Sequence, residues 1–243
     1  MWYAVLSDVH GNLEALETVV RDMSRHHIAR AICLGDMVGY YANPNECLDL
    51  IRAWPWLCIK GNHDRAVLGH LDMADFNTVA REALEWTGGI LRPDHRQWLA
   101  TLPDELEIAP CFVGVHGAPG DPDAYVFTPA EAEQAMVVFR QQYPQRAVCF
   151  YGHTHQRAVW AWPPVPEPEA AEIHLAPTGR YLINPGSVGQ SRDGVPGASY
   201  LWLDADTWTI VYRRVPYDYV VTQEKVLAAG LPAFLAERLA MGI

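Results

Sequence analysis

Long apolar runs, paired cysteines and basic side chains are all scarce in this sequence. No run approaches the roughly 20 consecutive apolar residues of a membrane-spanning helix, which argues against a membrane partner. The five cysteines are widely spaced and include no Cys-x-x-Cys pair, so neither a disulfide framework nor a cysteine zinc site is expected. We predict small core residues at the four that lie in or beside apolar strand segments: Cys33, Cys58, Cys111 and Cys149.

Acidic side chains outnumber basic ones, 29 against 18, which gives a formal net charge of −11. This balance argues against broad binding of a nucleic-acid backbone, which needs clustered positive charge. It does not exclude a small anionic substrate, because bound metal ions can set the local charge of a site. The N-terminus lacks a basic region followed by an apolar stretch, so the sequence predicts no signal peptide and a cytoplasmic protein.

The first 60 residues alternate between apolar runs and amphipathic segments. We predict, in order, strand 3–6, helix 13–25, strand 31–34, a helix opened by Asn43-Pro44, and strand 57–59. The same pattern resumes with strand 111–115, helix 129–143 and strand 147–151. Such alternation predicts a parallel sheet with right-handed crossovers.

Two other regions break this alternation. Residues 65–102 are predicted as a helical insertion, with helices at 65–71, 75–86 and 93–102. The C-terminal part is predicted as short strands at 158–162, 172–175, 181–183, 199–204 and 207–213, a stiff proline-rich connection at 163–169, and helices at 222–229 and 232–241. No composition shift marks a second domain. We therefore predict one α/β domain over residues 1–243, a two-sheet β-sandwich of mixed strands flanked by helices.

Five short polar blocks, each with glycine, follow five of the predicted strands. They are Asp8-Val9-His10-Gly11-Asn12, Gly35-Asp36, Gly61-Asn62-His63-Asp64, Gly114-Val115-His116-Gly117 and Gly152-His153-Thr154-His155. Strand ends in an open α/β sheet are where such folds place their sites. The blocks together supply more oxygen and imidazole groups than one metal ion needs, so the sequence predicts two metal ions.

Each block also has a simpler structural interpretation. Asp8 or Asn12 can cap the helix predicted at 13–25, and Asp36 can be a turn residue. We assign the cap to Asn12, whereas His10, two residues after Asp8, favours a metal there. A carboxylate can ligate through both oxygens, which makes Asp36 the natural bridge. The histidines outside the blocks are predicted to be structural or solvated: His26, His27, His70, His95 and His174.

The ordered blocks resemble the calcineurin-like metallophosphoesterase superfamily, whose pattern runs D-x-H, GD, GNH(D/E), GH and GHTH. The resemblance extends from Asp8 to about Asp193. With the late turn Asn184-Pro185-Gly186-Ser187-Val188-Gly189, the chain is most similar to the compact bacterial and archaeal phosphodiesterase branch. The resemblance implies a four-layer α/β/β/α sandwich and a binuclear-metal-dependent phosphoesterase. Its reaction would be hydrolysis of phosphodiesters or phosphomonoesters by a metal-bound hydroxide.

The resemblance also implies roles for individual residues. It assigns one divalent ion to Asp8, His10, Asp36 and His155, and the second to Asp36, Asn62, His116 and His153. His63 would bind a phosphate oxygen and protonate the leaving alkoxide, and Asp64 would orient His63 or start the next helix. Manganese is the expected metal, with iron, zinc, nickel or cobalt left open, because mixed nitrogen and oxygen ligation admits each of them.

The second block departs from the family's Ser/Thr protein phosphatases, which continue it as GD-x-x-DRG. Gly39 and Tyr40 stand where those enzymes have the Asp that supports the catalytic His and an Arg that grips phosphate. Tyr40 and Tyr41 are expected instead to stack a base or aryl group. Arg192 either supplies the missing phosphate contact or is a surface loop residue. The predicted substrate contacts are therefore Asn62, Tyr40 and Arg192.

Other functions stay open at this point. A dinucleoside-polyphosphate hydrolase and a weak Ser/Thr protein phosphatase are alternatives within the enzyme class. A non-catalytic scaffold is a different class, but scaffolds of this kind tend to lose the catalytic histidine or a ligand, and this chain keeps His63 and all seven predicted ligands. We expect a small phosphate-ester substrate, and the sequence leaves the oligomeric state open.

Overall fold

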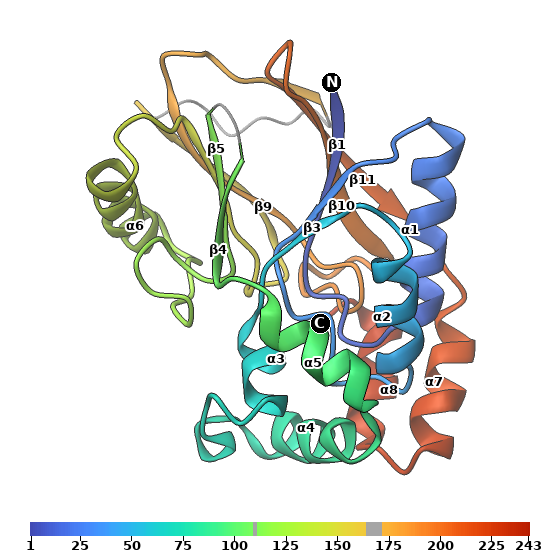
Figure 1. Cartoon of the computed structure of the whole chain (residues 1–243). Coiled ribbons are helices and arrows are strands. Elements are labelled where there is room, and N and C mark those ends of the chain that lie inside the picture. Colours follow the sequence, from blue (N-terminus) through green and yellow to red (C-terminus); the bar gives the residue numbers. More distant parts are fainter. Residues whose placement is uncertain (109–110, 164–171) are drawn as a thin grey trace.

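The computed structural model describes residues 1–108, 111–163 and 172–243. Two mixed β-sheets pack face to face, with helices on both outer sides (Figure 1). This confirms the predicted two-sheet α/β sandwich. The proline-rich connection predicted at 163–169 lies almost entirely outside the described residues.

The first sheet joins the N-terminal parallel strands to the C-terminal hairpin. Its order is β3 (Leu57–Cys58), β2 (Ala31–Cys33), β1 (Trp2–Leu6), β10 (Ala198–Asp204), β11 (Thr209–Val215) and β8 (Glu172–His174). Strands β1, β2 and β3 are parallel, whereas β10 pairs with β1 in the antiparallel sense. The N-terminal strand is therefore central, and residues far apart in sequence lie next to it.

The second sheet has a parallel centre and antiparallel edges. Its order is β4 (Glu105–Ile108), β5 (Phe112–Val115), β6 (Val148–Phe150), β9 (Arg180–Pro185) and β7 (Arg157–Trp162). Strands β5, β6 and β9 are parallel. Strand β4 was not predicted. Its Glu-Leu-Glu-Ile alternation is a signal for a half-exposed edge strand.

Helices cover the two outer faces and the lower end of the sandwich in Figure 1. They are α1 (Leu13–Arg25), α2 (Pro44–Arg52), α3 (Asn62–Val67), the 3₁₀ turn η1 (Met73–Asp75), α4 (Thr78–Ile90), α5 (Pro93–Thr101), α6 (Pro129–Gln142), α7 (Tyr219–Ala228) and α8 (Ala233–Met241). Helix α3 begins three residues before the predicted start, because the Asp64 carboxylate accepts the N–H of Gly61 at 3.0 Å. No helix in the described ranges is long and apolar enough to cross a membrane.

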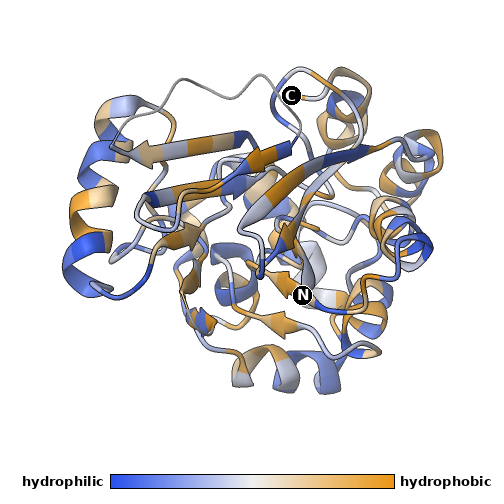
Figure 2. Ribbon diagram, turned by 90° about the horizontal axis from the view of Figure 1, so that it is seen from above, coloured by the Kyte–Doolittle hydropathy of each residue, from blue (hydrophilic) through white to orange (hydrophobic). Residues whose placement is uncertain are grey.

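Apolar side chains separate the layers. The core between the sheets includes Val5 and Ile32 from one sheet and Phe112 and Phe150 from the other. Helix α1 packs on the outer face of the first sheet and α6 on that of the second, so the order of layers is α/β/β/α. Figure 2 shows the strands predominantly apolar and the outer helices striped with hydrophilic residues. Burial of these faces stabilises the sandwich by the hydrophobic effect.

Candidate metal centre and substrate pocket

The five polar blocks converge because their strands end at one side of the sandwich. Strands β1, β2 and β3 of the first sheet and β5 and β6 of the second each lead into one block. Loops after the carboxyl ends of parallel strands meet at the same edge of a sheet. Residues that are more than 140 positions apart in sequence, such as Asp8 and His155, thereby come within reach of each other.

The backbone of these loops is strained. Six non-glycine residues have φ angles between +53° and +66°: Asp8, His10, Asp36, Tyr40, His153 and His155. Such conformations cost roughly 1–3 kcal/mol each and persist where the surroundings over-determine them, commonly at functional sites. Five of the six residues also lie in the groups of side chains that could hold a metal ion: Asp8, His10, Asp36, His153 and His155.

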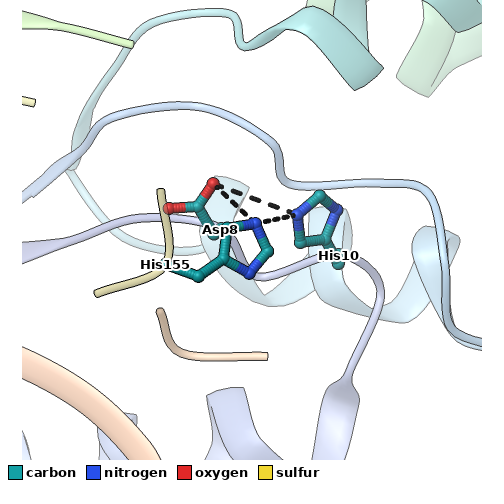
Figure 3. Close-up of side chains that lie close together, drawn as sticks. All are labelled: Asp8, His10 and His155. Atoms are coloured by element: carbon teal, nitrogen blue, oxygen red, sulfur yellow. Dashed lines mark hydrogen bonds and ion pairs between the residues drawn. The ribbon is translucent and has the colours of Figure 1, made fainter. Parts of the chain in front are cut away.

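Asp8, His10 and His155 form the first cluster (Figure 3). The Nε2 atoms of His10 and His155 lie 3.1 Å apart. Asp8 Oδ1 is 3.4 Å from Nε2 of His155 and has no hydrogen-bond partner in the described part of the chain. All three side chains are buried, so water does not solvate these facing polar atoms.

Asp36, His116 and His153 form the second cluster. Asn62 joins it, because its Oδ1 lies 3.0 Å from Nε2 of His116. Asp36 belongs to both groups: its Oδ2 is 3.5 Å from Nε2 of His10 and 3.4 Å from Nε2 of His116. One carboxylate oxygen therefore faces an imidazole of each cluster.

Backbone carbonyls fix the tautomer of the four cluster histidines. Nδ1 of His10, His116 and His155 donates to Val38, Leu34 and Gln190 at 3.1, 2.7 and 2.6 Å, and Nε2 of His153 donates to Asp123 at 3.1 Å. A carbonyl oxygen can only accept, so whenever one of these rings is neutral its other nitrogen is the one whose lone pair faces the cluster. This is how metal-ligating histidines are held.

These lone pairs face one another and two carboxylates, which is unfavourable without a cation. With no metal ion bound, burial lowers the pKa of His116, but the carboxylates of Asp36 and Asp8 and the Leu34 carbonyl together raise it to about 9. Burial raises the pKa of Asp8 to about 7. Both shifts favour the protonated forms of groups that face this centre. The unpaired oxygen of Asp8, the fixed tautomers and the nitrogen and oxygen donor set all fit divalent metal ions.

His63 lies within metal-ligand reach of His10 and Asp36, but no backbone carbonyl in the described ranges fixes its ring as one does for the four cluster histidines. Its side chain is 4% exposed, and Nδ1 has no hydrogen-bond partner within the described ranges. Its backbone N–H donates to Asp36 Oδ1 at 2.8 Å, which ties its position to the shared carboxylate. Burial lowers the pKa of His63 to about 4. A phosphate anion next to the ring would favour its protonated form.

Asp64 holds the loops rather than the His63 ring. Its carboxylate accepts the backbone N–H groups of Met37 and Val38 at 3.0 and 3.2 Å, besides that of Gly61. These bonds join the block after β2 to the block after β3. No hydrogen bond from Asp64 to the His63 ring occurs in the described structure, so the expected orienting role has no contact to support it.

The two adjacent tyrosines have different surroundings. The centroid of the Tyr40 ring lies 4.5 Å from that of His10 and 4.5 Å from that of His63. Tyr40 also lines a cavity beside the clusters. Tyr41 is fully buried and its hydroxyl accepts a hydrogen bond from Gln190 at 3.0 Å. The expectation that both tyrosines face a substrate is therefore wrong for Tyr41, whose side chain points into the core.

Two neutral side chains, Gln190 and Tyr40, hold the Arg192 side chain beside the clusters. Its guanidinium donates to Oε1 of Gln190 at 3.0 and 2.8 Å and to the hydroxyl of Tyr40 at 3.4 Å. No carboxylate pairs with it among residues 1–108, 111–163 and 172–243. Its positive charge is thus held in place without a direct ion pair in the described ranges.

A cavity of about 290 Å³ opens next to the clusters. Its lining includes Asp36, Tyr40, Asn62, His63, His153 and Arg192. The segment between α3 and α4 and the loop after β5 also contribute, through residues such as Phe76 and Tyr125. The Tyr125 ring stacks on that of His153 at 3.9 Å. The sequence does not reveal these two aromatic residues as part of the site, because both lie in loops outside the five polar blocks.

Buried Asp and His side chains that gather on both sides of Asp36, at the strand ends of a two-sheet sandwich, define an α/β protein with a candidate metal centre. The chain belongs to the calcineurin-like phosphoesterase superfamily, whose domain matches residues 1–208. This confirms the resemblance carried by the five blocks. Family membership indicates a hydrolase of phosphate esters.

Individual relatives agree with this assignment. An uncharacterized protein of Methanocaldococcus jannaschii is 36% identical over 242 residues, which is 98% of this chain and 97% of that protein. The structure is similar to that of a metallophosphoesterase from Sphaerobacter thermophilus, with 37% identity, a TM-score of 0.87, and coverage of 100% and 99% of the two chains. A hypothetical protein from Pyrococcus horikoshii shares the fold at 19% identity, with a TM-score of 0.81 and coverage of 100% and 98%.

Proposed function

We propose that this protein is a binuclear metal-dependent phosphodiesterase that acts on small phosphate esters in the cytoplasm. The observation that carries the proposal is the position of Asp36 Oδ2, which faces His10 of one cluster and His116 of the other. One metal ion would be held by Asp8, His10, Asp36 and His155, and the second by Asp36, Asn62, His116 and His153. When bound, two divalent ions supply positive charge to the phosphoryl oxygens and activate a water molecule as the nucleophile.

The protein's own side chains would bind and orient the phosphate. Arg192 carries an uncompensated charge next to the pocket, and Gln190 and Tyr40 hold its guanidinium in place. A positioned guanidinium recognises phosphate oxygens by charge-assisted hydrogen bonds. Asn62, at the start of α3, lies at the same pocket surface. These contacts support a phosphate-binding role for both residues.

His63 would donate the proton that the leaving alkoxide needs. The ring is buried, lines the pocket and is free of hydrogen-bond partners in the described structure, so its proton is not shared with the protein. Gly39 lies directly against Nδ1 of His63: a Cβ at Gly39 would come within 2.4 Å of that atom. A supporting Asp at this position, as in protein phosphatases, would not fit the same ring position.

The pocket and its charges favour small diesters over phosphoproteins. Its volume of about 290 Å³ is at the lower limit of about 300–1,000 Å³ for sites of drug-sized ligands. One guanidinium and two metal ions would supply enough positive charge to bind a singly charged diester. A phosphoserine peptide would have to bring its backbone into the cavity as well. A dinucleoside polyphosphate would extend beyond the pocket.

A substrate and metal panel tests the proposal. The purified protein, stripped with a chelator, is assayed with manganese, iron, zinc, nickel or cobalt. The substrates are bis-p-nitrophenyl phosphate, p-nitrophenyl phosphate, a diadenosine polyphosphate and a phosphoserine peptide. We expect no activity without metal and the highest kcat/KM for the diester with manganese. A metal-independent rate, or a clear preference for the peptide or the polyphosphate, would contradict the proposal.

A further inference from the structure

Two carboxylates line the pocket away from the metal ligands. Asp72 and Asp75 lie in the segment between α3 and α4, and both are exposed. Asp72 Oδ1 accepts the N–H of Ala74 at 2.9 Å, and neither carboxylate forms a salt bridge within the described ranges. A third pocket carboxylate, Asp123, is paired with Arg65. The segment thus presents negative charge that is not paired in a salt bridge within the described ranges, across the same cavity from Arg192.

Phe76 connects this acidic segment to the proposed proton donor. Its ring packs against that of His63 edge to face, with centroids 5.3 Å apart and an interplanar angle of 83°. It is half-buried and lines the same cavity. A group that leaves with a proton from His63 must lie against this ring, in the cavity that Phe76, Asp72 and Asp75 also line.

We propose that Asp72, Asp75 and Phe76 form a leaving-group subsite for a compact cationic substituent, such as the ammonium or trimethylammonium group of an amino-alcohol ester. Carboxylates attract such a group, and an aromatic ring adds a cation–π contact. A second phosphate at this position would be repelled by both carboxylates. The subsite rests on the proposed phosphodiesterase function and adds the class of its substrate.

The reaction at this subsite is ordinary hydrolysis. The water oxygen forms a new bond to phosphorus, and the bond from phosphorus to the leaving oxygen breaks. His63 gives that oxygen a proton and takes up one proton of the attacking water in return, and the second water proton is released to solvent. The products are a phosphomonoester dianion and the cationic alcohol.

Three aryl methyl phosphates that differ in leaving-group charge test the subsite: the 3-(trimethylammonio)phenyl, 3-tert-butylphenyl and 3-carboxyphenyl esters. The first two have the same shape, and the methyl group forces the aryl group to leave. Each ester is assayed with wild type and with Asp72→Asn/Asp75→Asn. Asn keeps an oxygen that can accept the Ala74 N–H. The esters differ in intrinsic reactivity, but this difference is the same for every variant. It therefore cancels when the ratio of kcat/KM for two esters is compared between wild type and the double variant.

The readout is the ratio of kcat/KM for the cationic ester to that for its neutral isostere. We expect this ratio to fall roughly fivefold in the double variant, the effect of two exposed ion pairs, and the anionic ester to gain. The wild-type preference should weaken with added salt. Glu82→Gln/Glu85→Gln is the matched control, because it removes two exposed carboxylates of α4 that do not line the pocket. It should shift the ratio by less than about twofold.

The outcomes separate the two proposals. Hydrolysis of all three esters with the same ratio in wild type and the Asp72/Asp75 variant overturns the subsite alone. If neither these esters nor bis-p-nitrophenyl phosphate is hydrolysed with any metal, the phosphodiesterase function fails. The subsite is then tested by calorimetry with (3-hydroxyphenyl)trimethylammonium and 3-tert-butylphenol. Equal affinity for the two phenols would overturn it.

Discussion

Polar side chains serve opposite purposes in the strand-end loops and at the helix starts. Asp36, after β2, has a φ angle of +53°, and its Oδ2 faces imidazole lone pairs. Thr128, before α6, has a φ angle of −112°, and its hydroxyl accepts the N–H of Glu131 at 3.3 Å. In return, the Glu131 carboxylate accepts the backbone N–H of Thr128 at 2.8 Å. The cap satisfies its own polar groups, whereas the loops leave theirs for a ligand.

The loops and the caps therefore contribute differently to the free energy of folding. Positive φ angles and facing polar atoms raise the free energy of the loops, and a bound cation would offset the electrostatic part of this cost. The caps lower the free energy of folding with no ligand present. Substitutions in the loops should therefore change metal content and rate, and those at the caps should change stability alone.

Replacing Asp36 by Asn should have the largest effect. Asn keeps an oxygen that can accept the His63 N–H but loses the charge that faces both clusters. We expect the loss of at least one metal ion per chain by elemental analysis and the loss of nearly all activity. Two ions per chain and normal turnover in this variant would show that the clusters do not share a carboxylate.

His63→Ala should affect rate without affecting metal content. General acid catalysis contributes typically 10²–10⁴-fold, so a diester with a poor leaving group should slow by about this factor. For p-nitrophenyl esters, whose leaving group needs little protonation, the loss should be smaller. Elemental analysis should still find both ions. Equal losses for good and poor leaving groups would exclude the proton-donor role.

Gly39→Ala, compared with Gly69→Ala, separates backbone strain from contact with His63. Both glycines have positive φ angles, +90° and +78°, so Ala should destabilise both by roughly 1–2 kcal/mol. A Cβ at Gly39 meets His63 Nδ1 at 2.4 Å, whereas one at Gly69 meets nothing within 4 Å. We expect a further fall in kcat, on the order of 10²-fold, for Gly39→Ala only, since the His63 ring must move. Similar kinetics for the two variants would contradict this.

Glu131→Gln should have the smallest effect, and its size should depend on pH. Hydrogen bonds from the N–H groups of Phe127 and Thr128 lower the pKa of Glu131 below its ordinary value of 4.5. The charged cap therefore stabilises the folded state above pH 4.5, and this contribution disappears as the pH falls through the lowered pKa. Thermal unfolding should show a lower Tm for the variant at pH 7 and nearly equal Tm values near pH 3. Metal content and kcat should not change.

Much of the fold and of the centre could be predicted from local sequence. Apolar strands followed by glycine and a ligand residue predicted where Asp8, Asp36 and His116 lie, because each strand carries its own block to the sheet edge. The side chain of Tyr41 could not be placed, since a backbone reversal at Tyr40 turns it inward. The role of Asp64 depended on backbone N–H groups 26 and 27 residues away, which no local pattern marks.

Sequence alone predicted most strands in chain order, the candidate ligand residues and the family, because hydrophobic period and motif spacing are properties of neighbouring residues. Tertiary structure decided which ring nitrogen of each histidine faces the centre, since the carbonyls that fix the tautomers come from other loops. It also decided the pocket, whose walls Phe76 and Arg192 are more than 100 residues apart. In a site at converging strand ends, the candidate ligand residues can be recognised from the local sequence. The charge balance and the shape of the site arise only when the two sheets pack together.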